Sequence, residues 1–136
     1  MDRFRFTTDV TVRFAETDAQ AVVHHAAYLV WFENARIDYL ARFDGGYPAL
    51  LEAGVDATTV EANIRYLAPA RFPDRLTIGV RCVAVRGARF RFEYAVERDG
   101  TLLADGWTAH ACVDARTLRP TRVPAFLAEA IAAAEG

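Results

Sequence analysis

One segment constrains the fold more than any other, the apolar stretch over residues 24–43, for which we predict a helix that starts at His24 or His25. Asn34, Asp38 and Arg42 recur every four residues and form one polar stripe. The other positions are apolar apart from one small charged patch. A surface helix needs only a single apolar stripe, so this pattern predicts a helix that a curved sheet covers on most sides.

Strand patterns surround this helix. We predict strands over 4–14, 58–68, 74–85, 89–97 and 101–114, a short helical turn over 48–54 and a final helix over 126–134. Asp99-Gly100 is typical of a tight type I′ hairpin. The connections after the helix are short, so those strands should be antiparallel in one α+β domain over residues 1–136. Exposed sheet edges in so short a chain predict at least a dimer.

The residue types that are present exclude several functions. The chain has no serine and no lysine, and all 16 of its basic residues are arginine. A serine nucleophile, a lysine Schiff base and a Walker P-loop are therefore excluded. The net charge of −2 offers no basic field for nucleic acid. The most apolar stretch carries four charges, so we expect no membrane span, and Cys82 and Cys112 are expected to be buried thiols in a reducing cytoplasm.

Asp18 carries the most informative chemistry. It follows the end of the first predicted strand, and the apolar helix begins seven residues later, at His25. The first turn of a helix presents backbone amides without internal partners, which can hold an oxygen that becomes negative during a reaction. A nearby carboxylate can serve as general base or nucleophile. Local chemistry alone favours a plainer role for Asp18 in an Asx-type turn, and for Glu16 in a solvated turn.

A resemblance strengthens the catalytic interpretation. The string Glu16-Thr-Asp18-Ala-x-x-Val22-Val-x-His25-Ala-x-Tyr28, followed by Phe32-Glu-x-Ala-Arg36, resembles the signature of 4-hydroxybenzoyl-CoA thioesterase-type proteins, with the Tol-Pal-associated acyl-CoA thioesterases as the most similar branch. The similarity continues through Ile64-Arg-Tyr66-Leu-Ala-Pro69. It implies a hotdog fold, in which an antiparallel sheet of five to six strands wraps around one long central helix.

The resemblance also implies roles for single residues. Asp18 matches the catalytic carboxylate, and His25 matches the position whose amide polarises the thioester carbonyl. Tyr28 and Glu33 are candidates for the acyl-binding site, Glu33 from an adjoining subunit or merely paired with Arg36. Arg86 and Arg89 are candidates for coenzyme A phosphates. Ala21 stands where the family usually has glycine and would strain the loop if its φ is positive.

We therefore expect an acyl-CoA thioesterase that needs no metal or organic cofactor, since coenzyme A is part of the substrate. The expected assembly is a homodimer at least, with a homotetramer favoured, and the sequence leaves the choice between dimer and tetramer open. Two alternatives stay open. One is a hotdog dehydratase or hydratase that uses His24, His25 or His110, and the other is a non-catalytic acyl-CoA binding protein. The sequence does not specify the acyl group.

Overall fold

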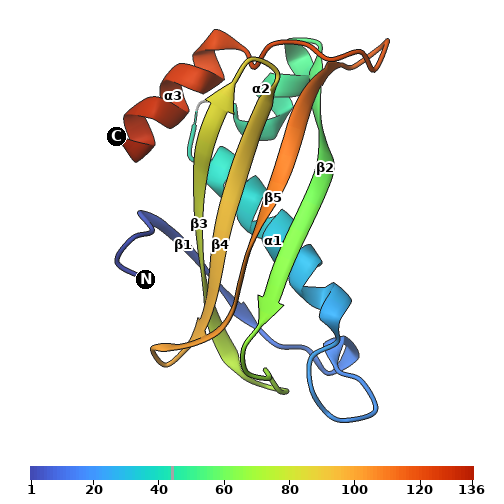
Figure 1. The fold of residues 1–136 in the computed structure, drawn as a ribbon, viewed down its shortest axis with the longest axis vertical. Helices are drawn as coiled ribbons and strands as arrows, with labels where there is room; N and C mark the ends of the chain where they lie inside the picture. The colour runs from blue at the N-terminus through green and yellow to red at the C-terminus, as the bar shows by residue number, and fades with distance from the viewer. Residues whose placement is uncertain (44) are drawn as a thin grey trace.

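The computed structural model describes residues 1–43 and 45–136. Within these ranges, five antiparallel strands form one sheet in the order β1-β3-β4-β5-β2. The long helix α1 (His25–Leu40) crosses one face of that sheet (Figure 1). The remaining elements are β1 (Phe6–Thr11), the 3-10 helix η1 (Phe14–Glu16), α2 (Gly46–Glu52), β2 (Val55–Tyr66), β3 (Arg75–Arg86), β4 (Arg89–Arg98), β5 (Thr101–Asp114) and α3 (Ala125–Glu135).

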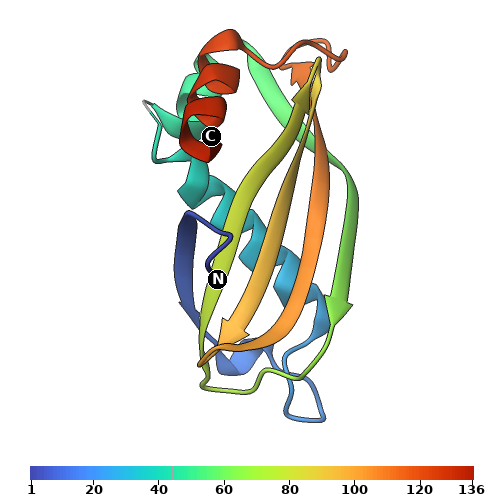
Figure 2. The ribbon, with the colours of Figure 1, turned by 60° about the vertical axis from the view of Figure 1, so that its left-hand side comes forward.

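The α+β architecture confirms the predicted fold class, with five strands. The Asp99-Gly100 hairpin is also confirmed, because both residues have positive φ, 49° and 81°, as a type I′ turn requires. The first strand is shorter than predicted, since the chain leaves the sheet to form η1. Figure 2 shows α2 and α3 gathered at the end of the sheet where β2 begins, and the start of α1 at the opposite end.

Aromatic packing holds α1 against the sheet. The ring of Phe32 stacks on Tyr94 of β4, with ring centroids 4.0 Å apart and planes only 2° from parallel. Gly106 of β5 lies directly beneath the helix, where an added Cβ would come within 3.2 Å of the Phe32 ring and 2.3 Å of the Asn63 carbonyl oxygen. Glycine at this position is therefore what permits the close approach of the helix.

The prediction that the helix is covered on most sides is wrong for the single chain. The buried face of α1 consists of Tyr28, Trp31, Phe32, Ala35, Tyr39 and Leu40. On the opposite face, Leu29, Val30 and Ile37 are 43%, 48% and 42% exposed. The helix also ends at Leu40, short of the predicted end. One sheet therefore covers only one face of this helix and leaves an apolar face open.

Glu16 corrects a second expectation, because it is buried and not part of a solvated turn. One carboxylate oxygen accepts a hydrogen bond from the Arg13 amide at 2.8 Å. The other accepts one from the indole nitrogen of Trp31, also at 2.8 Å. The His24 amide donates to the Glu16 carbonyl at 2.7 Å. Glu16 thus joins the end of η1 to the middle of α1 and fixes the loop between them.

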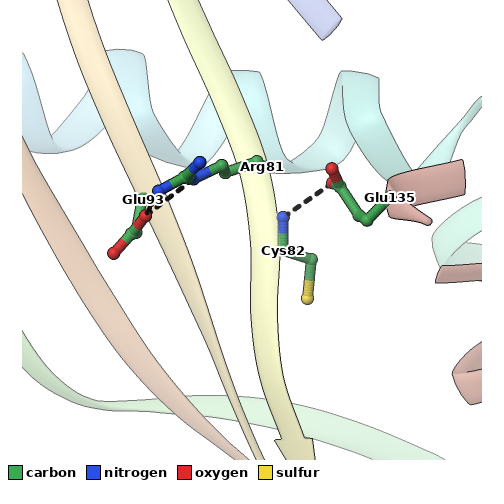
Figure 3. Close-up of polar contacts among 4 residues, drawn as sticks. All are labelled: Arg81, Cys82, Glu93 and Glu135. Atoms are coloured by element: carbon green, nitrogen blue, oxygen red, sulfur yellow. Dashed lines mark hydrogen bonds and ion pairs between the residues drawn. The ribbon is translucent and has the colours of Figure 1, made fainter. Parts of the chain in front are cut away.

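The C-terminal helix α3 is attached to the sheet through Glu135 (Figure 3). Its carboxylate accepts a hydrogen bond from the Cys82 amide at 3.0 Å, beyond the point where β1 stops pairing with β3. The same oxygen accepts the Tyr39 hydroxyl at 2.6 Å. On β3, Arg81 also pairs with Glu93 of β4. Both cysteines are buried free thiols, and burial raises the pKa of Cys82 to about 12 and that of Cys112 to about 11.

A chain of polar side chains crosses the core near α2 and α3. Arg36 donates to the Tyr94 hydroxyl at 3.1 Å, and Tyr94 contacts the Thr108 hydroxyl at 2.6 Å. Thr108 in turn lies 2.7 Å from Nε2 of His110. Burial, together with the positive charge of Arg36, lowers the pKa of His110 from 6.5 to about 4. His110 is therefore a neutral imidazole near neutral pH.

Replacing Trp31 by phenylalanine should lower the free energy of unfolding by about 1–3 kcal/mol, because it leaves a buried Glu16 oxygen without its donor. Denaturant unfolding of the purified protein measures this change. Trp107→Phe, the same substitution at the other tryptophan, is the matched control and should change stability by less than about 1 kcal/mol. Equal losses in both variants would contradict the anchoring role of Glu16.

His110 should make the fold sensitive to mild acid. Because its pKa is lower in the folded chain than in the unfolded one, its contribution is complete above pH 6.5 and is lost as the pH falls to about 4. The loss should amount to about 3 kcal/mol. Unfolding free energies measured across this range should fall less steeply for His110→Gln. Parallel pH profiles for parent and variant would show that His110 is not responsible.

Candidate active site

Residues 17–23, here called the Asp18 loop, form a tight turn between η1 and α1. Thr17 and Val23 form an isolated antiparallel bridge, and the Asp18 amide donates to the Val22 carbonyl at 2.8 Å. Val23 donates to the Ala70 carbonyl, which ties the loop to the segment after β2. Ala21 has a φ of 62°, in the left-handed region. The expectation that alanine is strained at this position is therefore confirmed.

The Asp18 carboxylate is exposed and takes part in its own loop. Its Oδ1 atom accepts hydrogen bonds from the Gln20 amide at 2.8 Å and from the Val22 amide at 3.4 Å. This is the Asx-type turn that local chemistry favoured. Among the described residues, no donor bonds to Oδ2. One oxygen thus stabilises the loop, and the other remains for reaction with a substrate or water.

The start of α1 supplies the second part of the site. His24 caps the helix, because its Nδ1 atom accepts a hydrogen bond from the Ala26 amide at 3.1 Å. The His25 amide donates to no acceptor in the part of the chain that the structure describes. Such an amide at a helix start can bind a partly negative oxygen.

Tyr66, at the end of β2, fixes His25 in place. Its ring stacks on the His25 imidazole, with centroids 4.5 Å apart, and its hydroxyl donates to the His25 carbonyl at 3.1 Å. Sequence reasoning placed Tyr66 within the family resemblance but assigned it no role, because a residue so distant in sequence gave no sign of this contact.

A cavity of about 230 Å³ lies beside the helix start. His25, Tyr28 and Tyr66 line it together with Val22, Val23 and the segment over 67–69. Tyr28 is buried, and burial is the main cause of its raised pKa. Asp18 is not among the lining residues, but Val22 is, and the Val22 amide bonds to the Asp18 carboxylate. The structure therefore brings His25 and Tyr28 to one cavity. Asp18 does not line this cavity but bonds to Val22, which does.

The other predicted binding residues lie elsewhere in the single chain. Arg86 and Arg89 face each other across the β3–β4 hairpin. That hairpin is at the far end of the sheet, whereas the Asp18 loop lies near the start of β3, where Val12 bonds to Asp74. Glu33 is exposed on α1, two turns beyond the helix start, and the described structure contains no ion pair between Glu33 and Arg36. One chain alone does not assemble all of these residues into a single site.

Candidate metal clusters and membrane-spanning helices are both absent from the described ranges. No cluster of three or more histidine, cysteine or acidic residues there has the geometry of a metal site. Nor does any helix in the described ranges have both the length and the apolar character to span a bilayer.

The chain is similar in sequence to known thioesterases. Residues 12–131 match the model of the thioesterase-like superfamily. The acyl-CoA thioester hydrolase YbgC of Escherichia coli is 31% identical over 125 residues, which cover 91% of this chain and 93% of that protein. The acyl-CoA thioesterase YbgC of Haemophilus influenzae is 34% identical over 120 residues, which cover 88% of each chain.

Solved structures extend the similarity to three dimensions. A hypothetical protein from Thermus thermophilus superposes with a TM-score of 0.87 at 37% identity, covering 93% of this chain and 97% of that one. A thioesterase from the same organism, solved with coenzyme A and zinc, has a TM-score of 0.87 at 31% identity and covers 100% of this chain and 98% of its own. By sequence and by its hotdog fold, this chain belongs to the thioesterase-like superfamily.

Proposed function

We propose that this chain is an acyl-CoA thioesterase, which hydrolyses a thioester to a free acid and coenzyme A. The observation that carries this proposal is that the Asp18 loop, which holds a carboxylate with a free oxygen, leads directly into the helix start where the His25 amide is unpaired among the described residues. His25 lines the cavity at this helix start, and the Asp18 carboxylate accepts a hydrogen bond from the amide of Val22, another lining residue. The relatives named as acyl-CoA thioesterases support the same activity.

The proposed chemistry follows from these groups. The His25 amide donates to the thioester carbonyl oxygen and stabilises the negative charge that develops there. The oxygen of a water molecule adds to the carbonyl carbon while Asp18 accepts its proton, and collapse of the adduct breaks the carbon–sulfur bond and returns a proton to the thiolate. Direct attack by Asp18 is the alternative, through an anhydride that water then opens. Neither route requires a metal or an organic cofactor.

The dehydratase alternative requires a histidine with a free nitrogen close to the substrate. His24 uses Nδ1 to cap the helix, and Nε2 of His110 contacts Thr108 in the core. His25 stacks on Tyr66, and its carbonyl accepts the Tyr66 hydroxyl. The relatives named as acyl-CoA thioesterases favour the hydrolase over the dehydratase.

We further propose that two copies pair through β2 and α1. Among the described residues, β2 pairs only with β5, which leaves its other edge free there, and Val60 at its bulge is 46% exposed. On α1, Leu29, Val30 and Ile37 form an exposed apolar face. An unpaired strand edge and an exposed apolar face are both typical of an interface. A homotetramer of two such dimers, located in the cytoplasm, is the full assembly that we propose.

Such pairing would bring the separated residues together. Antiparallel pairing of two β2 strands about a two-fold axis places the Tyr66 end of one copy beside the Val55 end of the other. The β3–β4 hairpin lies at that Val55 end, so Arg86 and Arg89 of the partner subunit would approach the Asp18 loop. Arginine binds phosphate groups through its paired N–H donors, so these two residues are suited to the phosphates of coenzyme A. Each site would then draw residues from two copies.

Asp18→Asn should lower kcat for thioester hydrolysis by at least about a hundredfold, because the amide cannot accept the proton. The asparagine oxygen can still accept the bonds from Gln20 and Val22, so folding and coenzyme A binding should remain. Release of free thiol measures turnover, and Asp9→Asn on the exposed side of β1 is the matched control. Hydrolysis by Asp18→Asn at the parent rate, or loss of parent activity to a chelator, would contradict the mechanism.

Val30→Glu should convert the dimer to monomer, because it buries an unpaired charge at the proposed interface. Analytical ultracentrifugation measures the mass, and the monomer should also lose hydrolysis if the site needs two copies. Phe126→Glu is the matched control, since Phe126 is 47% exposed on α3, outside the proposed interface. A parent protein that sediments as a monomer would refute the pairing.

A further inference from the structure

A second cavity lies at the end of the molecule opposite the Asp18 loop. It has a volume of about 220 Å³ and is enclosed by the second half of α1, by α2 and α3, and by the inner face of the sheet. Its walls are mainly apolar, with Phe90, Phe92, Leu127 and Ile131 among them. A cavity of roughly 150 Å³ already accommodates benzene. This one therefore has room for a substituted six-membered ring or a branched chain of similar size.

The polar chain in the core fixes the proton of His110 at this cavity. Arginine can only donate, so the Tyr94 hydroxyl accepts from Arg36, and Thr108 is the acceptor within reach of its own hydrogen. Thr108 then has one hydrogen left, for which Nε2 of His110 is the acceptor at 2.7 Å. Because His110 is neutral, its proton lies on Nδ1. Arg36 thus sets the tautomer of a histidine three hydrogen bonds away.

The polar groups at the cavity wall are consequently donors. Nδ1 of His110 has a single neighbour among the described polar side chains, the Thr59 hydroxyl, at the long distance of 3.3 Å. His110, Thr59 and Arg36 all line the cavity, and Thr59 can turn its own hydrogen toward a ligand. An oxygen acceptor on a ligand could take the place of the Thr59 hydroxyl and accept a shorter, stronger hydrogen bond from Nδ1 of His110.

The charges around the cavity argue for a neutral acceptor. Arg36 contributes a positive charge, and Glu33, one turn before it on α1, contributes a negative charge to the same wall. These charges oppose each other, so a carboxylate or an ammonium group gains little there. A ketone, ether or hydroxyl oxygen matches the donors and brings no charge. His110 also stacks on Phe90, with centroids 5.1 Å apart, which leaves only the ring edge to meet the ligand.

We propose that this cavity receives the acyl group of the substrate, and that the Nδ1 proton of His110 selects acyl groups with a neutral oxygen acceptor far from the thioester. The assignment rests on the proposed function, because it needs the second copy to bring its Asp18 loop to this end of the sheet. His110 is then the specificity-determining residue, Thr59 lines the cavity beside it, and Arg36, Tyr94 and Thr108 are positioning residues that act through His110.

Two coenzyme A thioesters of equal size test the proposal. One carries a ketone near the far end of the chain, and in the other a methyl branch replaces the ketone oxygen. The parent should prefer the ketone by about tenfold or more in kcat/KM, the effect of about 1.4 kcal/mol of hydrogen bonding. His110→Phe should abolish or reverse the preference, and Thr59→Val should leave it largely intact because Nδ1 still donates. Equal kcat/KM values for the two thioesters in the parent would overturn the proposal.

Two measurements remain decisive if a variant fails to fold or no thioester is hydrolysed. Nitrogen NMR of the His110 imidazole should show a protonated Nδ1 in the parent and a mixture of tautomers in Thr108→Val. Calorimetry with the amides of the same two acids, joined to coenzyme A through nitrogen, should show tighter binding of the ketone. A protonated Nε2, or equal affinities, would refute the His110 assignment. Absence of turnover with ketone-selective binding would refute only the proposed hydrolysis.

Discussion

The burial of one aromatic face of α1 against the sheet is the interaction on which the other features depend. Trp31, Phe32 and Tyr39 are almost completely buried, and Gly106 allows the helix to approach the strands beneath it. Once this contact is made, the direction of α1 is fixed, and its first turn must emerge at the end of the sheet where η1 ends. The bond between Glu16 and Trp31 then holds the incoming loop at that turn. The candidate chemistry at Asp18 and His25 follows from a packing contact that involves neither residue.

Sequence patterns predicted most of the fold because alternation and turn chemistry are local. The alternation of Phe90, Phe92 and Tyr94 and the Asp99-Gly100 turn placed β4, β5 and their hairpin correctly. The buried state of Glu16 could not be predicted, because its indole partner lies on another element. The open face of α1 was also missed, since apolar residues look the same in a sequence whether a chain's own sheet or a second chain is to cover them.

The candidate site, like the fold, could be predicted only in part from the sequence. The family resemblance located Asp18 and His25, and the structure places them in one loop and at one helix start. Glu33, Arg86 and Arg89 were predicted for the same site but lie far along the molecule. Residue spacing along one chain does not reveal where a second copy would bind, so the sequence could not predict that these residues separate into two groups. In the single chain, the Asp18 loop lies at one end of the sheet and the β3–β4 hairpin lies at the other.

The positive φ of Ala21 has a consequence for the stability of the Asp18 loop. A methyl group in the left-handed region costs the turn roughly 1–2 kcal/mol, which glycine would avoid. The bonds between the Asp18 amide and the Val22 carbonyl, and between the Val22 amide and the Asp18 carboxylate, act against this cost. The position of the carboxylate consequently depends on hydrogen bonds to a residue that also forms part of the cavity wall.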